Sequence, residues 1–307
     1  MKIKSMLIPA ILCVFIFLAS SCGQQSGSDG ETRLVADVLG REVEIPVKVE
    51  SIITLGSGAP RLAAYLDVMD MLVGAEEYDK NDVVVLRDYH PVHHAKLLTL
   101  PTVGSGGGSG NNNGFPEEII NISPDVILAA FDLEAADELQ AQTGIPVVSV
   151  RHSTGLAPDD FYTAMRVFAD VVGAQERCET VLTFADTMKE DLYSRTIDIS
   201  DDEKLRAYAG AVTWNGRRGF AGTYSVFGIF DAINAVNVAH TDGIDGFFEA
   251  DLESVLVWDP DIIFLDPGNM DLVNGEYDIN PGYFNALRAV QEAMSIPCPR
   301  LTLQVQT

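Results

Sequence analysis

The chain has 307 residues, of which 47% are hydrophobic and 21% are charged, and its formal net charge is −25. This composition is typical of globular proteins and excludes a chain that is wholly disordered, collagen-like or coiled coil. At roughly 150 residues per domain, the length predicts two domains. The strong negative charge would repel a phosphate backbone, so nucleic acid is disfavoured as a partner.

The N-terminus has the pattern of a secretory signal. Lys2 and Lys4 precede an apolar run at residues 6–18, which is too short to span a hydrocarbon core of ~30 Å as a stable helix. We therefore expect a signal peptide at residues 1–21. No later run is long and apolar enough to cross a membrane, and we expect the mature protein to be extracytoplasmic.

Small residues lead to Cys22, and this run resembles the lipobox of bacterial lipoproteins, in which the cysteine becomes the lipidated N-terminus. Ala19 stands where that motif usually has Leu. We expect lipidation of Cys22 and a flexible tether at residues 22–32, so that the protein is anchored to the cell membrane or is periplasmic. Ordinary cleavage near Ser21, or an uncleaved anchor, is the alternative.

Strands and helices alternate through the first half of the chain. Residues 34–38 and 42–45 flank a turn that contains Gly40, which predicts a hairpin. The other expected elements are strands at residues 51–55, 71–75, 125–130 and 146–150, a helix opening at Pro60, and helices at residues 116–120 and 133–143. This alternation implies a mostly parallel, doubly wound sheet.

The rhythm changes at Asp159. From there to Ser194 the chain has no Pro and only one Gly, Gly173, while apolar residues recur close to the helical period. This predicts an inter-lobe helix at residues 159–196, on the order of 50 Å long, that is most easily broken at Gly173. An N-terminal α/β lobe at residues 33–158 and a C-terminal α/β lobe at residues 197–292 would flank it.

The second half repeats part of the first. Residues 117–128 match residues 253–264, and both segments place a Pro-Asp pair between a helix and an apolar strand. The other elements expected in this half are strands at residues 205–212, 237–240 and 261–265 and helices at residues 225–234 and 252–258. The fold class is therefore expected to be α/β, with two doubly wound, Rossmann-like lobes joined by a long backbone helix.

Five segments in this order resemble the helical-backbone class of periplasmic substrate-binding proteins, which serve ABC importers for ferric siderophores, cobalamin and haem. They are ADVLGREVEIPVKVESIITL, ISPDVILAA, the long helix, NAVNVAH and DLESVLVWDPDIIFLDP. The resemblance runs from about Arg33 to Glu292. It implies a cleft between two rigid lobes, modest hinge motion and delivery of cargo to a permease.

The function expected on this basis is capture of a ferric complex, a siderophore-type iron chelate, by a lipoprotein of an ABC importer. Cobalamin or haem is the alternative cargo, and a ligand sensor or a metalloenzyme is the alternative class. No cofactor is expected. No enzyme activity is expected either, because the sequence has no G-x-S-x-G or H-E-x-x-H motif and Cys178 has no positioned base.

Two features depart from the family pattern. Arg61 stands where the family usually carries a surface Glu that meets a permease Arg, which puts docking to a typical permease in doubt. Residues 293–307 have no helical period where the family usually continues with a strand and a closing helix. We hypothesise that this aberrant tail is out of register, through a frameshift or a truncation, and that the C-terminal lobe is incomplete.

Candidate ligand residues in the N-terminal lobe lie in loops. Ser57 follows the expected strand at residues 51–55, and Tyr78 follows the one at residues 71–75. The glycine-rich segment 104–114 contains Ser105 and Asn111. Backbone amides in that segment could hold an anion. The alternative is a plain flexible loop, and a dinucleotide site is disfavoured because Ser109 takes the place of the third Gly in G-x-G-x-x-G.

Further candidates follow other strands, where α/β sheets bind their ligands. Trp214, Arg217 and Arg218 come after the first strand of the C-terminal lobe, with Tyr224 close behind, and paired Arg beside aromatics suits an anionic planar ligand. Arg151 and its neighbour His152 follow residues 146–150. Salt bridging at the surface, and a contact between lobe and helix, are the respective alternatives.

Three of the five His lie in residues 88–94. His90 and His93 are candidate metal ligands, since imidazole binds Fe(III), Zn(II) or Mn(II). The spacing fits no strong metal motif, and Pro91 disfavours a single helix face. A solvated loop is the alternative.

Overall fold

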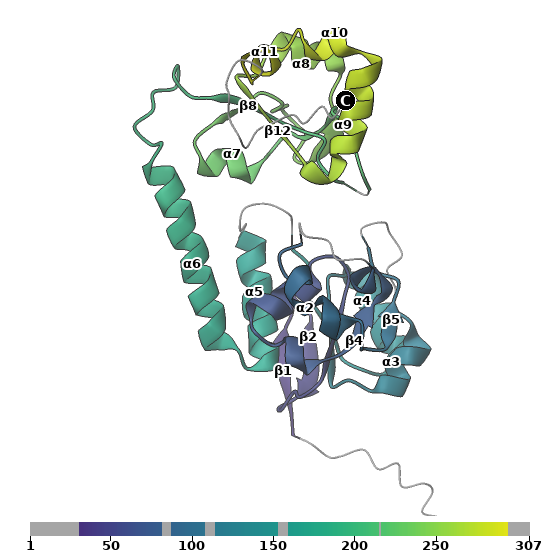
Figure 1. Ribbon diagram of the computed structural model, residues 1–307. Helices are drawn as coiled ribbons and strands as arrows, with labels where there is room; N and C mark the ends of the chain where they lie inside the picture. Colours follow the sequence, from purple (N-terminus) through teal and green to yellow (C-terminus); the bar gives the residue numbers. More distant parts are fainter. Residues whose placement is uncertain (1–30, 82–86, 108–113, 153–158, 215, 294–307) are drawn as a thin grey trace, which may run out of the picture. The chain divides into compact units, whose positions relative to one another are not determined.

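The computed structural model describes residues 31–81, 87–107, 114–152, 159–214 and 216–293. Two α/β regions make up this part of the chain (Figure 1). We call residues 32–152 the N-terminal lobe and residues 206–293 the C-terminal lobe. Within the described ranges no helix is both long and apolar enough to cross a membrane.

The N-terminal lobe is built on a parallel sheet of five strands in the order β5-β4-β3-β6-β7. The hairpin of β1 (Thr32–Ala36) and β2 (Glu42–Pro46) stands beside it as a separate antiparallel pair. The sheet strands are β3 (Ile52–Leu55), β4 (Leu72–Glu76), β5 (Thr102–Gly104), β6 (Val126–Ala129) and β7 (Val147–Ser149). The predicted doubly wound topology is confirmed.

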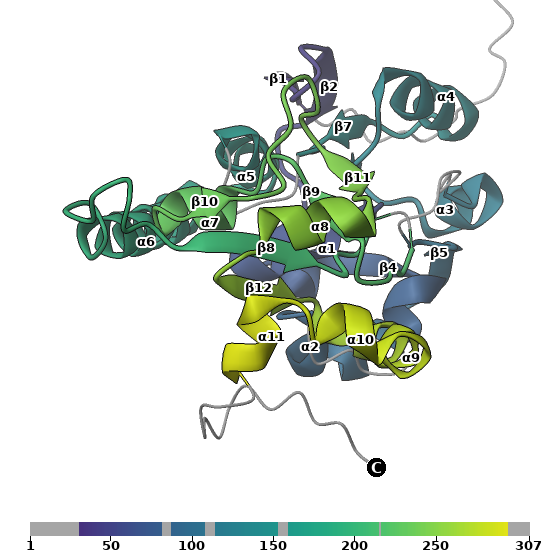
Figure 2. The same cartoon turned by 90° about the horizontal axis from the view of Figure 1, so that it is seen from above.

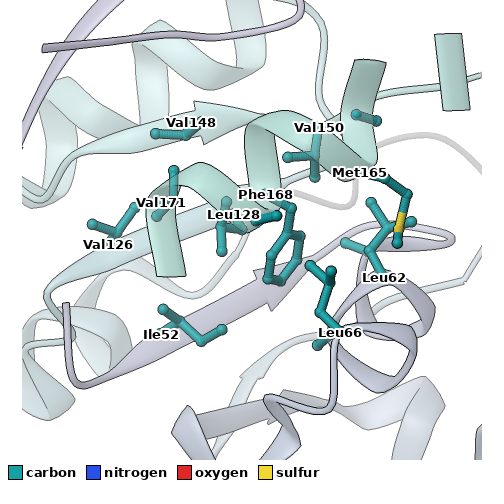
Figure 3. Packing of buried hydrophobic residues seen from close by; sticks show 14 of the residues in the cluster. Ile52, Leu62, Leu66, Val126, Leu128, Val148, Val150, Met165, Phe168 and Val171 are labelled. Atoms are coloured by element: carbon teal, nitrogen blue, oxygen red, sulfur yellow. The ribbon is translucent and has the colours of Figure 1, made fainter. Parts of the chain in front are cut away.

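Alternating side chains of these strands belong to two hydrophobic cores, because successive residues of a strand point to opposite faces of the sheet. Ile52 and Leu128 face α1 (Ala59–Tyr65) and α5 (Asp159–Val172), where the ring of Phe168 is fully buried (Figure 3). On the opposite face, the neighbouring strand residues pack against two other helices. These are α3 (Pro116–Ile122) and α4 (Leu133–Thr143).

The C-terminal lobe has a smaller parallel sheet, β10-β8-β12, and an antiparallel pair of β9 and β11 (Figure 2). Tyr208 of β8 faces one core, and its neighbours Ala207 and Ala209 face the other. The strands are β8 (Arg206–Gly210), β9 (Gly222–Tyr224), β10 (Val236–Asn237), β11 (Phe247–Glu249) and β12 (Ile262–Leu265). The helices are α7 (Gly228–Ala232), α8 (Leu252–Trp258), α9 (Met270–Ile279), α10 (Pro281–Phe284) and α11 (Arg288–Ala293).

The internal sequence repeat is a structural repeat. Ser123 and Asp259, 136 residues apart in the sequence, both end a helix in the left-handed conformation. The aspartate two residues later then ties each corner to the neighbouring strand: Asp125 accepts hydrogen bonds from the amides of Glu50 and Ser51, and Asp261 accepts one from the amide of Arg206. Both halves therefore use one helix–corner–strand unit.

The two halves differ beyond that unit. β6 lies between β3 and β7 and is fully buried, whereas no described strand pairs with the outer side of β12. Phe264 of β12 is accordingly 43% exposed. Among the described residues, the C-terminal sheet is thus the less completely covered of the two.

The helix expected at residues 159–196 is divided at Gly173, the position where a break was expected, so a single helix of about 50 Å does not form. Gly173 has a φ of 75°, and α6 (Gln175–Ser194) turns back along α5 (Figure 1). Tyr162 donates a hydrogen bond to Asp186 at 2.6 Å, and Arg166 pairs with Glu179 at 2.9 Å, as an antiparallel helix pair requires. The 20 residues of α6 give a helix of about 30 Å.

Two further expectations are corrected. Residues 88–94 contain a helix start and not a loop, because Pro91 occupies the first turn of α2 (His90–Leu97), where its missing N–H costs nothing. The helix expected at residues 225–234 is only α7, and β9 precedes it. Apolar periodicity did not separate these short elements.

We predict opposite effects for two Gly→Ala changes. Gly173→Ala should lower the free energy of unfolding by about 1 kcal/mol, because an L-residue is strained at positive φ. Gly275→Ala, inside α9 where an added Cβ meets nothing within 4 Å, should raise it by about 0.5–1 kcal/mol. Urea denaturation measures both, and equal effects of the two changes would contradict the turn at Gly173.

Candidate functional site

A cleft of about 1340 Å³ is lined by residues from both lobes and from α5 and α6. Its aromatic wall comes from the C-terminal lobe, and its cationic groups are Arg151 and Lys189. The lining residues used below are Val38, Leu39, Arg151, His152, Asp159, Asp160, Lys189, Glu190, Tyr193, Trp214, Tyr224, Asp231, Asp245 and Phe247. Three residues singled out from the sequence as ligand-binding, Arg151, Trp214 and Tyr224, are among them.

The aromatic wall is set by strand register. Tyr224 at the end of β9 lies opposite Phe247 at the start of β11, and their rings meet edge to face at 6.1 Å. Trp214, on the loop after β8, stacks on Phe247 with ring centroids 6.2 Å apart and is 42% exposed. Such a surface offers an apolar face to a flat ligand.

Arg217 and Arg218, the expected anion ligands, do not line the cleft. Arg217 pairs with Asp271 and donates from Nε to Asn269 Oδ1 at 3.1 Å. Arg218 pairs with Glu249 at 3.3 Å, and its Cζ lies 5.2 Å from the centroid of the Phe247 ring. Arg218 therefore braces the aromatic wall from within the lobe.

Arg151 and His152 follow β7 and are the residues of that loop that line the cleft on the side of the N-terminal lobe. Arg151 is exposed, and among the described residues its guanidinium has no hydrogen-bond or ion-pair partner. His152 packs edge to face on Phe161 of α5 at 5.5 Å. Arg151 is thus available to a ligand, whereas His152 is partly held by the helix.

Val38 and Leu39, in the turn between β1 and β2, line the cleft. Asp37 holds this turn in place. The buried Asp37 carboxylate accepts hydrogen bonds from the amides of Leu39 and Ser149 and pairs with Arg41 at 2.7 Å. The sequence pattern predicts this turn only as a hairpin connection. It also missed Lys189, Glu190 and Tyr193, because a helical period shows which face is apolar and not which polar residues border a cavity.

A second group lies where β3, β4 and β5 end, outside the cleft lining. Ser57 is exposed after β3, and Tyr78 is stacked under Arg87, whose Cζ is 3.7 Å from the ring centroid. The Tyr78 amide donates to the carbonyl of Ser105 at 3.0 Å, so these two expected residues are neighbours. Asn111 lies outside the described residues.

Glu76 is buried beneath this group and was not found from sequence. It ends β4, is 3% exposed, and accepts a hydrogen bond at 3.0 Å from the amide of Gly56. Burial raises the pKa of Glu76 to about 7; the Gly56 hydrogen bond opposes this rise, and the nearby Asp79 adds to it. Gly106 passes so close to Glu76 that an added Cβ would clash with it, which requires glycine there.

The two candidate metal ligands have different surroundings. His90 is fully buried, and its Nε2 lies 2.8 Å from the carbonyl oxygen of Asp79; His93 is partly exposed on the same helix. In the described part of the chain no three His, Cys, Asp or Glu side chains are grouped so that they could hold a metal ion. Within those ranges, this pair therefore has no third ligand.

We predict that stability falls with pH because of Glu76. Its folded pKa of about 7 exceeds the unfolded value, so the folded state binds more protons between pH 4.5 and 7 and loses stability as pH rises through that window. Glu76→Gln should raise the free energy of unfolding by about 1–3 kcal/mol at pH 8 and change it little at pH 4. The exposed neighbour Glu77→Gln is the control, and an unaltered pH profile in Glu76→Gln would refute the assignment.

Comparison with known proteins places this geometry in a family. The model of the periplasmic binding protein family matches residues 52–283. The molybdate-binding protein MolA of Haemophilus influenzae is 25% identical over 298 residues, covering 89% of this chain and 77% of MolA.

Solved structures agree on the fold. MolA bound to molybdate has a TM-score of 0.65 at 21% identity, covering 85% of this chain and 81% of MolA. A periplasmic solute-binding protein from Veillonella parvula also has a TM-score of 0.65, at 18% identity, with coverage of 86% and 77%. The haem-binding protein HmuT has a TM-score of 0.57 at 18% identity, and the match covers 87% of this chain and 82% of HmuT. The chain belongs to the periplasmic binding protein family, and its fold is that of the helical-backbone class that the sequence resembles.

Proposed function

We propose that this protein is the extracytoplasmic binding component of an ABC importer and captures a ferric complex of an organic chelator in the cleft. The observation that carries the proposal is a cleft of about 1340 Å³ with an aromatic wall of Trp214, Tyr224 and Phe247. Ligand sites for drug-sized molecules usually have volumes of about 300–1,000 Å³. A cleft of this size suits a bulky chelate.

The relatives bind different cargo, so we infer the ligand of this chain from its own residues. MolA is named for molybdate and HmuT for haem. A tetrahedral oxyanion would leave most of the cleft filled with water and would not use its aromatic wall. Haem and cobalamin remain alternatives, since both are large and carry a flat ring.

Side chains from both lobes have roles in this proposal. Trp214 and Phe247 offer ring faces to the apolar part of the chelate, and Arg151 offers a guanidinium for its oxygen atoms. Ser57, Tyr78 and Ser105 lie outside the cleft lining, and they would contact the ligand only if it extended to the end of the N-terminal sheet. His90 would serve the fold and not the cargo, because its ring is buried.

Anchoring and delivery complete the proposal. Lipidation of Cys22 would hold the protein at the membrane beside its permease. At the expected docking position, Arg61 is paired with Asp88 at 3.0 Å, and the Asp88 side chain is about half exposed. This carboxylate offsets the positive charge of Arg61 and reduces its repulsion of a cationic permease residue.

Titration of the mature protein tests the ligand class. We expect ferric chelates to quench tryptophan fluorescence saturably, and Trp214→Phe to remove most of the signal, because Trp214 lines the cleft. Trp258→Phe is the control, since Trp258 packs against the core of the C-terminal lobe.

Phe247→Ala should weaken binding of the ferric chelate about tenfold, whereas Phe184→Ala, at an exposed position on α6, should not. Binding of molybdate in competition with the chelate would favour an oxyanion carrier instead.

Membrane attachment is tested separately. Cys22→Ser should remove the lipid and release the protein into the soluble extracytoplasmic fraction, as followed by membrane fractionation and by labelling with a radioactive fatty acid. Cys178→Ser is the matched control, because Cys178 is buried in the N-terminal core. Equal labelling of the Cys22→Ser variant and the unaltered protein would refute lipidation.

A further inference from the structure

The cleft lining carries more negative than positive charge. Among the described residues, five carboxylates line it, against the two cations Arg151 and Lys189. The carboxylates come from several elements, and only two of them, Asp159 and Asp160, are neighbours in the sequence. They are Asp159 and Asp160 of α5, Glu190 of α6, Asp231 of α7, and Asp245 before β11.

Pairing within the protein does not remove this excess. Glu190, Asp231 and Asp245 have no hydrogen-bond or ion-pair partner for their carboxylates in the part of the chain that the structure describes. Of the two cations, Lys189 lies over the ring of Tyr162, with Nζ 5.5 Å from the centroid. Arg217 and Arg218, which would have balanced the charge, are paired with Asp271 and Glu249 inside the C-terminal lobe.

We infer that the cleft selects neutral or cationic ferric chelates, of the hydroxamate type, and rejects polyanionic ones of the catecholate type. This inference rests on the proposed function and deepens it. Three hydroxamate groups, each a monoanion, neutralise one Fe(III), and an ammonium on the chelator makes the complex cationic. Three catecholate groups, each a dianion, leave the complex a trianion, which the lining carboxylates would repel at short range.

The aromatic wall fits the same ligand class. A ring face carries partial negative charge, so the rings of Trp214 and Tyr224 would attract an ammonium group. Their apolar faces would also pack against the methylene chain of a hydroxamate chelator. A trianion gains little from a ring face. Of the described arginines, Arg151 alone lines the cleft, and one oxygen of a neutral iron–hydroxamate centre is enough to engage its guanidinium.

The test is a pair of ferric complexes that differ in charge. At low ionic strength we expect the mature protein to bind a cationic trihydroxamate complex at least tenfold more tightly than a trianionic tricatecholate complex, measured by isothermal titration calorimetry. The double variant Asp231→Asn, Asp245→Asn should narrow this ratio at least threefold, and so should 0.5 M NaCl. The double variant Asp202→Asn, Asp278→Asn removes two exposed carboxylates outside the cleft and should leave the ratio unchanged.

The outcomes separate this inference from the proposed function. If both complexes bind and the tricatecholate binds as tightly or more tightly, the charge selection is wrong while the carrier function stands. If the ratio is the same in both double variants, the lining carboxylates do not cause it, and the inference is also wrong. If neither complex binds, the proposed ferric-chelate function itself fails.

Discussion

Parallel pairing of strands is the constraint on which the rest of the molecule depends. In each lobe, an aspartate after a proline accepts hydrogen bonds from the start of the neighbouring strand, Asp125 for β3 and Asp261 for β8. This bond sets the register in which β6 and β12 run beside those strands. Because parallel strands end at one edge of the sheet, the loops that follow them collect the polar side chains of each lobe.

The cleft combines an apolar wall with an acidic surround. The rings of Trp214, Tyr224 and Phe247 are arranged by the pairing of β9 with β11, which is local to the C-terminal lobe. Three of the lining carboxylates, Asp159, Asp160 and Glu190, come from α5 and α6, whereas Asp231 and Asp245 belong to the lobe that supplies the rings. The charge of the cleft therefore depends on more of the chain than its aromatic wall does.

Paired arginines show how tertiary contacts change a sequence-based assignment. Two adjacent Arg beside aromatic residues in a very acidic chain suggest an anion site. In the folded lobe, Asp271 and Glu249, 54 and 31 residues further along the chain, take up these charges. Arg151 had the weaker case in sequence, yet it is the guanidinium that faces the cleft.

The sequence alone determined the alternation of strands and helices and the repeat of residues 117–128 at 253–264, because these depend on periodicity and on local turn chemistry. It also indicated the family, through the resemblance of several segments to known members. It also marked Gly173 as the weak point of the long helix, and Trp214 and Tyr224 as candidate site residues, which the structure places in the cleft lining. Only the tertiary structure decided that α6 turns back along α5, that His90 is buried, and that Glu76 lies beneath the glycine turns. These outcomes depend on contacts between residues distant in the chain, and a local pattern does not encode them.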